Sequence, residues 1–188
     1  MILAPFPSVR RATLADVASV ARLSVCANQE AWDEVPGLHQ AIEPTAPDIA
    51  LRLLEDLDDG HVLYVAGYQR CDVGFAHVTG PTTEGGGQEV ELKCIYVAPE
   101  HRCHGLGRQL LRFAVRDLRN HPNPRALRAW AATASSSARF LSVAGGQPVR
   151  ERWKVSQGTF AVRGIVFEWP ARDNRRAAER VAVTATAG

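Results

Sequence analysis

One stretch of this 188-residue sequence, Val90 to Asn120, combines a strand pattern, a glycine-bearing turn and a helix pattern. The strand pattern is rich in β-branched and aromatic residues, and it ends before Pro99, which has no amide hydrogen to donate to a sheet. The helix pattern is stronger, because apolar residues recur along one face and arginines along the other. The apolar face contains Leu106, Leu110, Leu111, Ala114, Val115 and Leu118, and the polar face contains Arg108, Arg112, Arg116 and Arg119. The stretch therefore predicts a strand followed closely by an amphipathic helix.

The turn between strand and helix carries Gly105 and Gly107. The first amide groups of a helix have no acceptor within it, and the helix dipole is positive at that end. Glycine lets a ligand approach the backbone closely, and Arg102 adds a planar, positively charged guanidinium group beside the turn. The turn therefore predicts an anion site suited to a phosphate or pyrophosphate.

Three phosphate-binding patterns compete for this turn. A P-loop requires a Gly-Lys-Ser/Thr ending, whereas this chain has Gly107-Arg108-Gln109. A dinucleotide fingerprint requires a third glycine, where this chain has Leu110, and an acidic residue in a second strand. The third pattern, Arg/Gln-x-x-Gly-x-Gly/Ala, is matched in full from Arg102 to Gly107.

Together with the preceding Tyr96-Val-Ala-Pro-Glu-His-Arg102, this turn resembles the motif of the GNAT superfamily of N-acetyltransferases. The resemblance implies an α/β (α+β) fold with a mixed, mostly antiparallel sheet of about seven strands, about four flanking helices and a parallel strand pair at the cofactor site. It implies acetyl-CoA as the cosubstrate and no metal. The residues expected to bind acetyl-CoA are Ile95, Tyr96, Val97, Arg102, Cys103, His104, Gly105, Leu106, Gly107, Arg108 and Ser135.

The strand also contains an irregularity. Val90 and Leu92 share one face, whereas Ile95 and Val97 share a face of opposite parity, so the apolar phase slips between them. A β-bulge produces such a slip. The resembling family has a bulge in this strand, where freed backbone groups hold the pantetheine arm and the thioester carbonyl.

Acetyl transfer to an amine requires a base that takes a proton from the ammonium group, and the departing thiolate benefits from an acid. Glu91 is the candidate base, with Glu89 and Glu34 in reserve; the alternative for Glu91 is an exposed or substrate-positioning carboxylate. Ser142 stands where many relatives carry a tyrosine acid. A serine hydroxyl is a much weaker acid than a phenol, so Tyr96 is an alternative and the general acid stays open.

Residues 27–47 follow no clear period, and we expect a loop or short helix there. The segment is acidic and aromatic, and Trp32 and Glu34 are candidate substrate-binding residues, since carboxylates and aromatic rings suit a cationic amine. The alternative is a loop with one buried tryptophan. The expected activity is transfer of an acetyl group to a primary amine of a small molecule, peptide or protein by direct attack in a ternary complex. The alternative function is a non-catalytic acyl-CoA-binding or regulatory module on the same fold.

Periodicity and turn residues predict the other elements. Thr13 and Asp16 predict a helix N-cap. Helices are expected at 14–25, 47–57 and 135–143, and strands at 9–13, 61–68, 71–79, 127–132, 149–156 and 159–169. We expect an N-terminal extension (1–7), one N-acetyltransferase domain (8–170) and a poorly ordered tail (171–188).

Composition and sequence patterns limit which partners, location and metal ions can be expected. The net charge of +2 gives no case for nucleic acid, and we find neither a signal peptide nor a membrane span, so a cytoplasmic location is expected. A metal site built from His101, Cys103 and His104 lacks a second ligand pair. The last two expected strands, at 149–156 and 159–169, form a closing hairpin that carries Trp153 and Trp169. This hairpin is a candidate homodimer surface, with core packing as the alternative.

Overall fold

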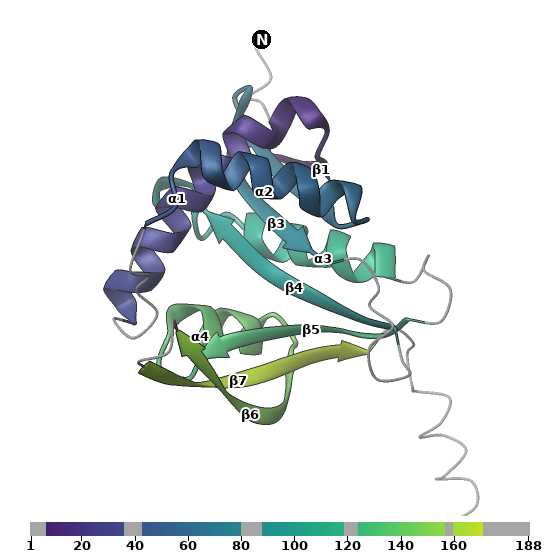
Figure 1. Ribbon diagram of the computed structural model, residues 1–188. Helices are drawn as coiled ribbons and strands as arrows, with labels where there is room; N and C mark the ends of the chain where they lie inside the picture. The colour runs from purple at the N-terminus through teal and green to yellow at the C-terminus, as the bar shows by residue number, and fades with distance from the viewer. Residues whose placement is uncertain (1–6, 36–42, 80–87, 119–123, 157–159, 171–188) are drawn as a thin grey trace, which may run out of the picture.

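The computed structural model describes residues 7–35, 43–79, 88–118, 124–156 and 160–170. One seven-stranded sheet runs through it in the order β1-β2-β3-β4-β5-β7-β6 (Figure 1). The strands are β1 (Ser8–Arg11), β2 (Val62–Tyr68), β3 (Cys71–Val78), β4 (Gln88–Val97), β5 (Pro124–Ala132), β6 (Gln147–Ser156) and β7 (Phe160–Pro170). The helices are α1 (Val17–Glu34), α2 (Ala46–Asp58), α3 (Leu106–Leu118) and α4 (Ser136–Val143), with short 3-10 turns η1 (Leu14–Asp16) and η3 (Pro99–His101). Strands β4 and β5 run parallel and the other neighbouring pairs antiparallel, which confirms the predicted mixed sheet with one parallel pair.

The helices cover both faces of the sheet and bury two apolar cores. The core under α3 and α4 includes Leu110, Leu127 and Leu141. The core under α1 and α2 includes Val20 and Phe75. Among the described residues, no helix is long and apolar enough to cross a membrane.

The phase slip in β4 is a real bulge. Val90, Leu92, Ile95 and Val97 all pack into the core under α3, although their positions change parity. Opposite β3, His77 pairs with Cys94 and Val78 pairs with Leu92, so Lys93 is the extra residue. The predicted bulge is therefore confirmed, and it lies at Lys93.

A loop or short helix was expected over residues 27–47; residues 27–34 are instead the end of the long helix α1, which continues to Glu34. This segment contains good helix formers, such as Ala27, Gln29 and Glu30, and no glycine or proline interrupts it before Pro36. The rest of the expected acceptor loop, at 36–42, lies outside the described residues, as do residues 1–6 of the extension and the tail at 171–188.

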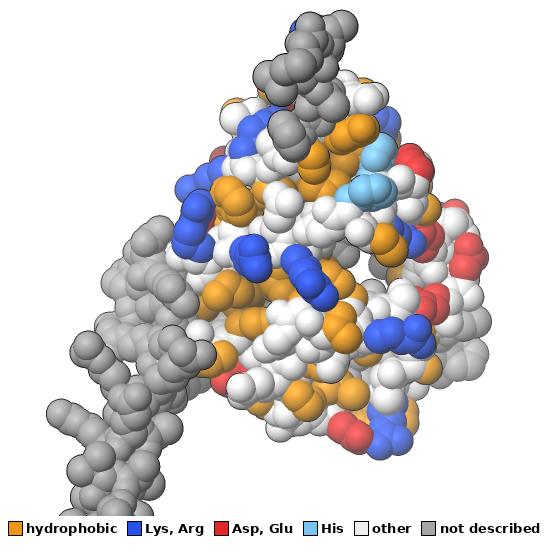
Figure 2. Space-filling model, turned by 180° about the vertical axis from the view of Figure 1, so that it is seen from behind, with side chains coloured by type: hydrophobic (Ala, Val, Ile, Leu, Met, Phe, Trp, Pro, Cys, Tyr) orange, Lys and Arg blue, Asp and Glu red, His pale blue; other side chains and the backbone are white. Residues whose placement is uncertain are grey.

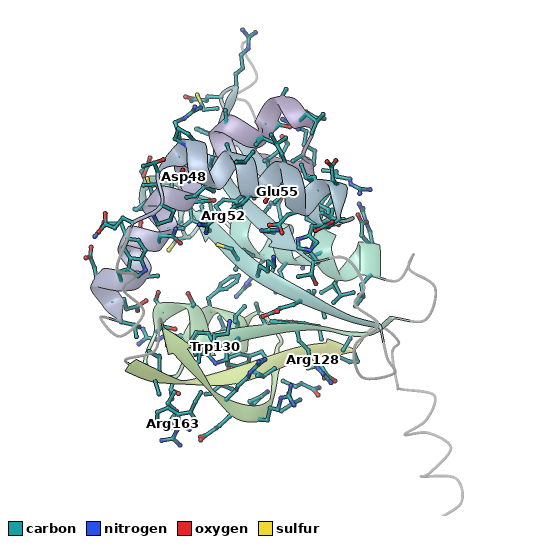
Figure 3. The ribbon with its side chains drawn as sticks, viewed as in Figure 1. Asp48, Arg52, Glu55, Arg128, Trp130 and Arg163 are labelled. Atoms are coloured by element: carbon teal, nitrogen blue, oxygen red, sulfur yellow. The ribbon has the colours of Figure 1, made fainter. Side chains whose placement is uncertain are left out.

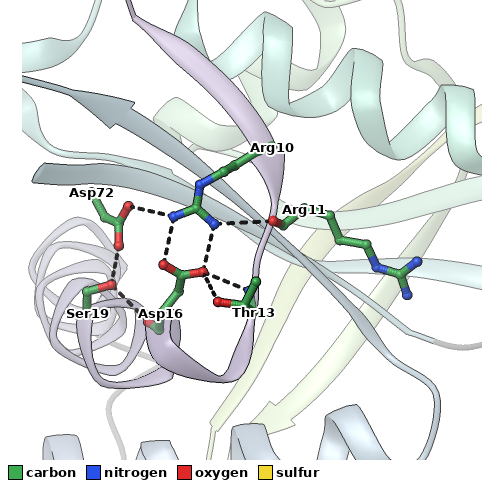
Figure 4. A network of polar contacts seen from close by, with 6 residues as sticks. All are labelled: Arg10, Arg11, Thr13, Asp16, Ser19 and Asp72. Carbon is green, nitrogen blue, oxygen red and sulfur yellow. Dashed lines mark hydrogen bonds and ion pairs between the residues drawn. The ribbon is translucent and has the colours of Figure 1, made fainter. Parts of the chain in front are cut away.

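A polar network joins β1, the start of α1 and β3 (Figure 4). The guanidinium of Arg10 donates two hydrogen bonds of 2.7 Å to the carboxylate of Asp16. The same carboxylate accepts from the amide of Thr13 at 2.7 Å, as the predicted capping residues require. Ser19 donates to Asp72 of β3. Arg10 holds the pKa of Asp16 well below its ordinary range, with burial opposing that shift.

Candidate functional site

The parallel ladder between β4 and β5 is short. It joins Val90 to Leu127 and Glu91 to Arg128, and it ends there, while β4 continues beside β3 as far as Val97 (Figure 1). Beyond Glu91 the edge of β4 that faces away from β3 is therefore not paired with β5.

The backbone groups on this edge can be assigned from the β3–β4 ladder. The amide of Ala98 donates to the carbonyl of Val73 at 2.8 Å. Residues of an antiparallel strand alternate between facing the partner and facing away from it. The amides of Val97 and Ile95 are therefore directed to the edge that β5 leaves unpaired.

The turn after β4 ends at an open helix N-terminus. Cys103 and Gly105 both have positive φ angles, of 63° and 81°, and a methyl group built on Gly105 would meet no atom within 4 Å. Helix α3 begins at Leu106, and its first turn closes when the amide of Gln109 donates to the carbonyl of Gly105 at 3.0 Å. The amides of residues 106–108 precede this bond and have no acceptor within the helix, so they are available to an anion, as the sequence predicts.

Helix α4 packs beside this turn. A methyl group built on Gly107 would lie 3.2 Å from the ring of Phe140, so the glycine lets the ring approach the first turn of α3. The hydroxyl of Ser135 caps α4, because it accepts from the amide of Ala138 at 3.1 Å and donates to the carbonyl of Ala132 at 2.7 Å. The structure thus brings the expected cofactor residue Ser135 to the end of β5.

Arg102 is held by α1 and β4. Its Nε donates to the carbonyl of Val97 at 2.8 Å, and its NH2 group donates to Glu30 at 2.5 Å. The hydroxyl of Tyr96 donates to the same carboxylate at 2.7 Å, and the guanidinium lies 5.5 Å from the centre of the Tyr96 ring. Burial, together with the Glu30 carboxylate, raises the pKa of Tyr96. No local signal marks Glu30 in the sequence, because its partners come from distant segments.

The candidate base Glu91 lies at the point where the β4–β5 ladder ends. Its side chain is 45% exposed, and its Oε1 lies 3.9 Å from Nζ of Lys154 on β6. Lys154 in turn lies over the ring of Trp130, 4.6 Å from its centre. Burial lowers the pKa of Lys154, and the Glu91 carboxylate partly offsets this. The sequence analysis missed Lys154 and Trp130, because their positions near Glu91 follow only from how β5 and β6 pack in the folded chain.

Trp130 belongs to β5 and lies across β7. Its ring occupies the space above Gly164, where a side chain would collide with it, and its Nε1 donates to the carbonyl of Arg152 at 3.1 Å. Figure 3 shows Trp130 and Arg128 on the same strand. Arg128 is paired with Glu168 of β7, 2.9 Å away.

The structure locates the expected substrate residues at the end of α1. Trp32 is 7% exposed. Glu34 accepts hydrogen bonds from the amide and from the hydroxyl of Ser136, the latter at 3.0 Å, so it joins α1 to the N-terminus of α4. Ser142 lies exposed on α4. The roles of these residues in binding and catalysis stay predictions.

The remaining candidates in the turn lie apart from one another. His104 is exposed, and its Nδ1 lies 2.6 Å from the carbonyl of Arg102, whereas the ring of His101 lies against Tyr68. Among the described residues, these histidines and Cys103 are not among the side chains that converge closely enough to hold a metal ion.

The exposed face of α3 is basic. Figure 2 shows Lys and Arg side chains gathered across the back of the molecule, over α3. Arg108, Arg112 and Arg116 are exposed on this helix, and Arg108 belongs to the turn that carries the anion site. The positive side chains therefore continue from the predicted anion site along the helix.

Comparison with known proteins agrees with this geometry. The sequence matches the model of the Acetyltransferase (GNAT) family over residues 27–142, which include β4, the turn and α3. It matches no curated protein.

Three solved structures share the fold. The ribosomal-protein-alanine N-acetyltransferase of Brucella melitensis is 20% identical, with a TM-score of 0.69 over 87% of this chain and 99% of that one. The phosphinothricin acetyltransferase of Sinorhizobium meliloti, in complex with acetyl-CoA, is 21% identical, with a TM-score of 0.68 over 87% and 88%. NAA60 of Arabidopsis thaliana, in complex with a bisubstrate analogue, is 16% identical, with a TM-score of 0.61 over 88% and 98%. The family match covers more than half of the sequence, and the chain therefore belongs to the GNAT acetyltransferase family.

Proposed function

We propose that this protein is an acetyl-CoA-dependent N-acetyltransferase that acts on a primary amine of a small molecule or peptide. The observation that carries the proposal is the junction of two features. The unpaired edge of β4, from Leu92 to Val97, leads directly into the open N-terminus of α3. Acetyl-CoA is an extended thioester that carries a pyrophosphate. It needs an unpaired strand edge for its arm and a helix N-terminus for its pyrophosphate.

In this proposal the pyrophosphate of acetyl-CoA binds the amides of the first turn of α3, beside the side chain of Arg108. The amides of Ile95 and Val97 bind the pantetheine arm and the thioester carbonyl. Because both amides belong to a strand anchored by β3, they are ordered before the cosubstrate arrives, which is what stabilisation of an oxyanion requires. The Sinorhizobium meliloti enzyme, which shares the fold, is in complex with acetyl-CoA, and this supports acetyl-CoA as the cosubstrate.

The reaction is a direct attack within a ternary complex. Glu91 takes a proton from the acceptor ammonium, and the resulting amine attacks the thioester carbonyl carbon. A carbon–nitrogen bond forms and the carbon–sulfur bond breaks. The attacking nitrogen then gives up its second proton, which neutralises the departing CoA thiolate, so that the products are the amide and CoA thiol. Lys154, 3.9 Å from the Glu91 carboxylate, orients that carboxylate at the end of the β4–β5 ladder.

Titration calorimetry with acetyl-CoA tests the cofactor site. We expect binding with a dissociation constant in the micromolar range, and its loss in Gly105→Glu. Gly145→Glu is the matched control, since Gly145 also has a positive φ angle, of 89°, and equally open surroundings. Absence of binding by the unmodified chain, or equal losses in both variants, would contradict the proposal.

Thiol release then tests the transfer itself, over a panel of polyamines, amino acids, aminoglycosides and peptides with free N-termini. One observation favours the alternative of a non-catalytic acyl-CoA-binding module. Ser142 presents only a hydroxyl where relatives carry a phenol, and the phenol of Tyr96 is bonded to Glu30. Acetyl-CoA affinity without thiol release across the panel would support that alternative.

The domain limits of 8–170, the cytoplasmic location and the homodimer stay predictions. Trp153 on β6 is 59% exposed, so it is the residue of the closing hairpin that a dimer interface would cover.

A further inference from the structure

A second cluster of titratable side chains lies where α2, β2 and β3 meet. Asp56 belongs to the last turn of α2, His61 directly precedes β2, and His77 lies in β3. Nδ1 of His61 is 3.2 Å from Oδ1 of Asp56 and 3.1 Å from Nε2 of His77. Nε2 of His77 is 3.4 Å from Oδ2 of Asp56. The two ring nitrogens and the carboxylate, which faces each nitrogen with a different oxygen, thus form a compact triangle of three groups, each of which offers a ligand atom within 4.8 Å of the others.

Hydrogen bonds alone do not satisfy this triangle. A ring nitrogen of a neutral histidine is either a donor or an acceptor. If both inner nitrogens carry hydrogen, two donors face each other across 3.1 Å. If only one does, the other nitrogen and the carboxylate that it faces are both acceptors. A cation held by all three groups removes this conflict.

The triangle also has the dimensions of a metal site. Zinc binds histidine nitrogen and carboxylate oxygen at about 2.0–2.2 Å in a tetrahedral arrangement, which separates neighbouring ligand atoms by about 3.3–3.6 Å. The separations of 3.1 Å between the two nitrogens, and of 3.2 and 3.4 Å from the nitrogens to Oδ1 and Oδ2 of Asp56, lie close to this range. Three protein ligands would leave the fourth position open to water or to another ligand.

The backbone holds two of these residues in place. The amide of His61 donates to the carbonyl of Asp56 at 2.9 Å, and the amide of Gly60 donates to that of Leu57 at 3.1 Å. With a φ angle of 85° at Gly60, these bonds close the end of α2 as a Schellman motif. Leu63, two positions after His61, pairs across the sheet with His77, so His61 is the diagonal neighbour of His77.

Lys93, the bulge residue of β4, pairs with Asp56 and would compete with a metal ion for its carboxylate. Its Nζ lies 3.2 Å from Oδ1 of Asp56, and its side chain is 40% exposed. This ammonium pairs with the carboxylate from the solvent side, and it can move out into water. We propose that Asp56, His61 and His77 bind a divalent transition-metal ion of the zinc class, and that Lys93 weakens this binding by competing for Asp56.

The test uses the full chain, stripped of metal with a chelator and titrated with Zn²⁺ by calorimetry and with Co²⁺ by visible absorption. We expect one ion per chain with a dissociation constant in the micromolar range or below, and the strong visible bands of four-coordinate Co²⁺. Substituting a residue that only supports a metal ligand typically lowers the affinity for the metal about 10–100-fold. Asp56→Asn and His61→Gln remove ligands themselves, so each should lower the affinity for Zn²⁺ by at least that factor. Circular dichroism verifies that both variants fold.

Two control variants should keep the affinity of the unmodified chain. Asp59→Asn removes a neighbouring acid of the same turn, and His101→Gln removes a histidine of another site. Lys93→Met should bind Zn²⁺ about 10-fold more tightly, equivalent to about 1.4 kcal/mol. Absence of one-to-one binding, or equal affinity in His61→Gln and the unmodified chain, would overturn the proposal. The second outcome would assign the ion to other ligands, such as the free cysteines.

Discussion

At the scale of single residues, the proposed chemistry depends on Glu91. It lies where β4 leaves β5, and its only charged neighbour among the ion pairs of the described residues is Lys154. If Glu91 is the base, Glu91→Gln should lower kcat by about 100-fold or more, the value of a positioned proton acceptor. The dissociation constant of acetyl-CoA should not change, because the carboxylate does not bind the cosubstrate.

The measurement is the initial rate of thiol release with the best amine of the panel. Glu151→Gln is the matched control, since Glu151 is another exposed strand acid paired with a cation, Arg163. An undiminished kcat in Glu91→Gln would leave Glu91 as the exposed strand acid that the sequence also allowed.

Residues close together in the sequence were the predictable part of this site. The glycines, Arg102 and the capping pair at Thr13 depend on backbone rules that act within one turn. Glu30 and Lys154 were not predictable, because their positions beside Tyr96 and Glu91 follow from how α1 and β6 pack. For the same reason the metal-binding hypothesis at His101 missed the triangle of Asp56, His61 and His77.

At the scale of elements, local periodicity located most strands and helices, including the bulge in β4. The period of two makes a slip visible wherever one face is buried, so Val90 and Ile95 revealed it without any knowledge of the partner strand. The length of α1 was not visible in this way. Its second half carries few apolar residues on a single face, and its helical state depends on helix propensity and on contacts with β4 and α4.

One such contact is the bond between Glu34 and the N-terminus of α4. Glu34→Ala removes an acceptor from the amide and hydroxyl of Ser136, and loss of a capping side chain costs about 0.5–2 kcal/mol. We expect a decrease of about 1 kcal/mol in the free energy of unfolding, measured by urea denaturation. Asp33→Ala, at the preceding exposed position, should change it much less. Equal effects of the two substitutions would contradict a capping role.

The packing of β5 against β7 depends on Gly164. A methyl group there would enter the space of the Trp130 ring, and an overpacked site costs about 1–3 kcal/mol. Gly164→Ala should therefore destabilise the protein by that amount and weaken binding of the acceptor amine, because it displaces the ring under Lys154. Gly67→Ala is the matched control, since a methyl group in that strand meets its nearest atom at 3.7 Å. Similar melting temperatures for the two variants would contradict this account.

At the scale of the whole molecule, the sheet has two parts that separate after Glu91. Strands β1 to β4 carry α1 and α2 on one face, whereas β5, β7 and β6 carry α4 on the other. The two parts are joined by the short parallel ladder, by α3 and by Glu34. The candidate site lies at this division, far along the chain from β1 and η1. A variant in the polar network that joins β1 to η1 should therefore lower the free energy of unfolding without changing the affinity for acetyl-CoA.

The network of Asp16 provides that variant and predicts a pH dependence. Arg10 holds the pKa of Asp16 below its ordinary value of 3.8. A carboxyl group whose pKa is lower in the folded than in the unfolded chain stabilises the fold. This stabilisation is fully present above the pKa of the unfolded chain, and it is lost as pH falls through the pKa of the folded chain. Hydrogen bonds to a charged group are worth about 1.5–3 kcal/mol, so Asp16→Asn should lose roughly that amount at pH 7.

Below about pH 4 the difference between Asp16→Asn and the unmodified chain should shrink, because the Asp16 carboxylate of the unfolded chain takes up a proton there, whereas that of the folded chain stays ionised to lower pH. Urea denaturation at pH 7, 5, 4 and 3 measures the difference directly, and Asp58→Asn, at an exposed position of α2, is the control. A difference that stayed constant down to pH 3 would show that Asp16 acts by packing rather than by charge. If acetyl-CoA affinity at pH 7 fell together with stability, the division between the two parts of the sheet would not hold, because a change in β1 and the start of α1 would then reach the turn before α3.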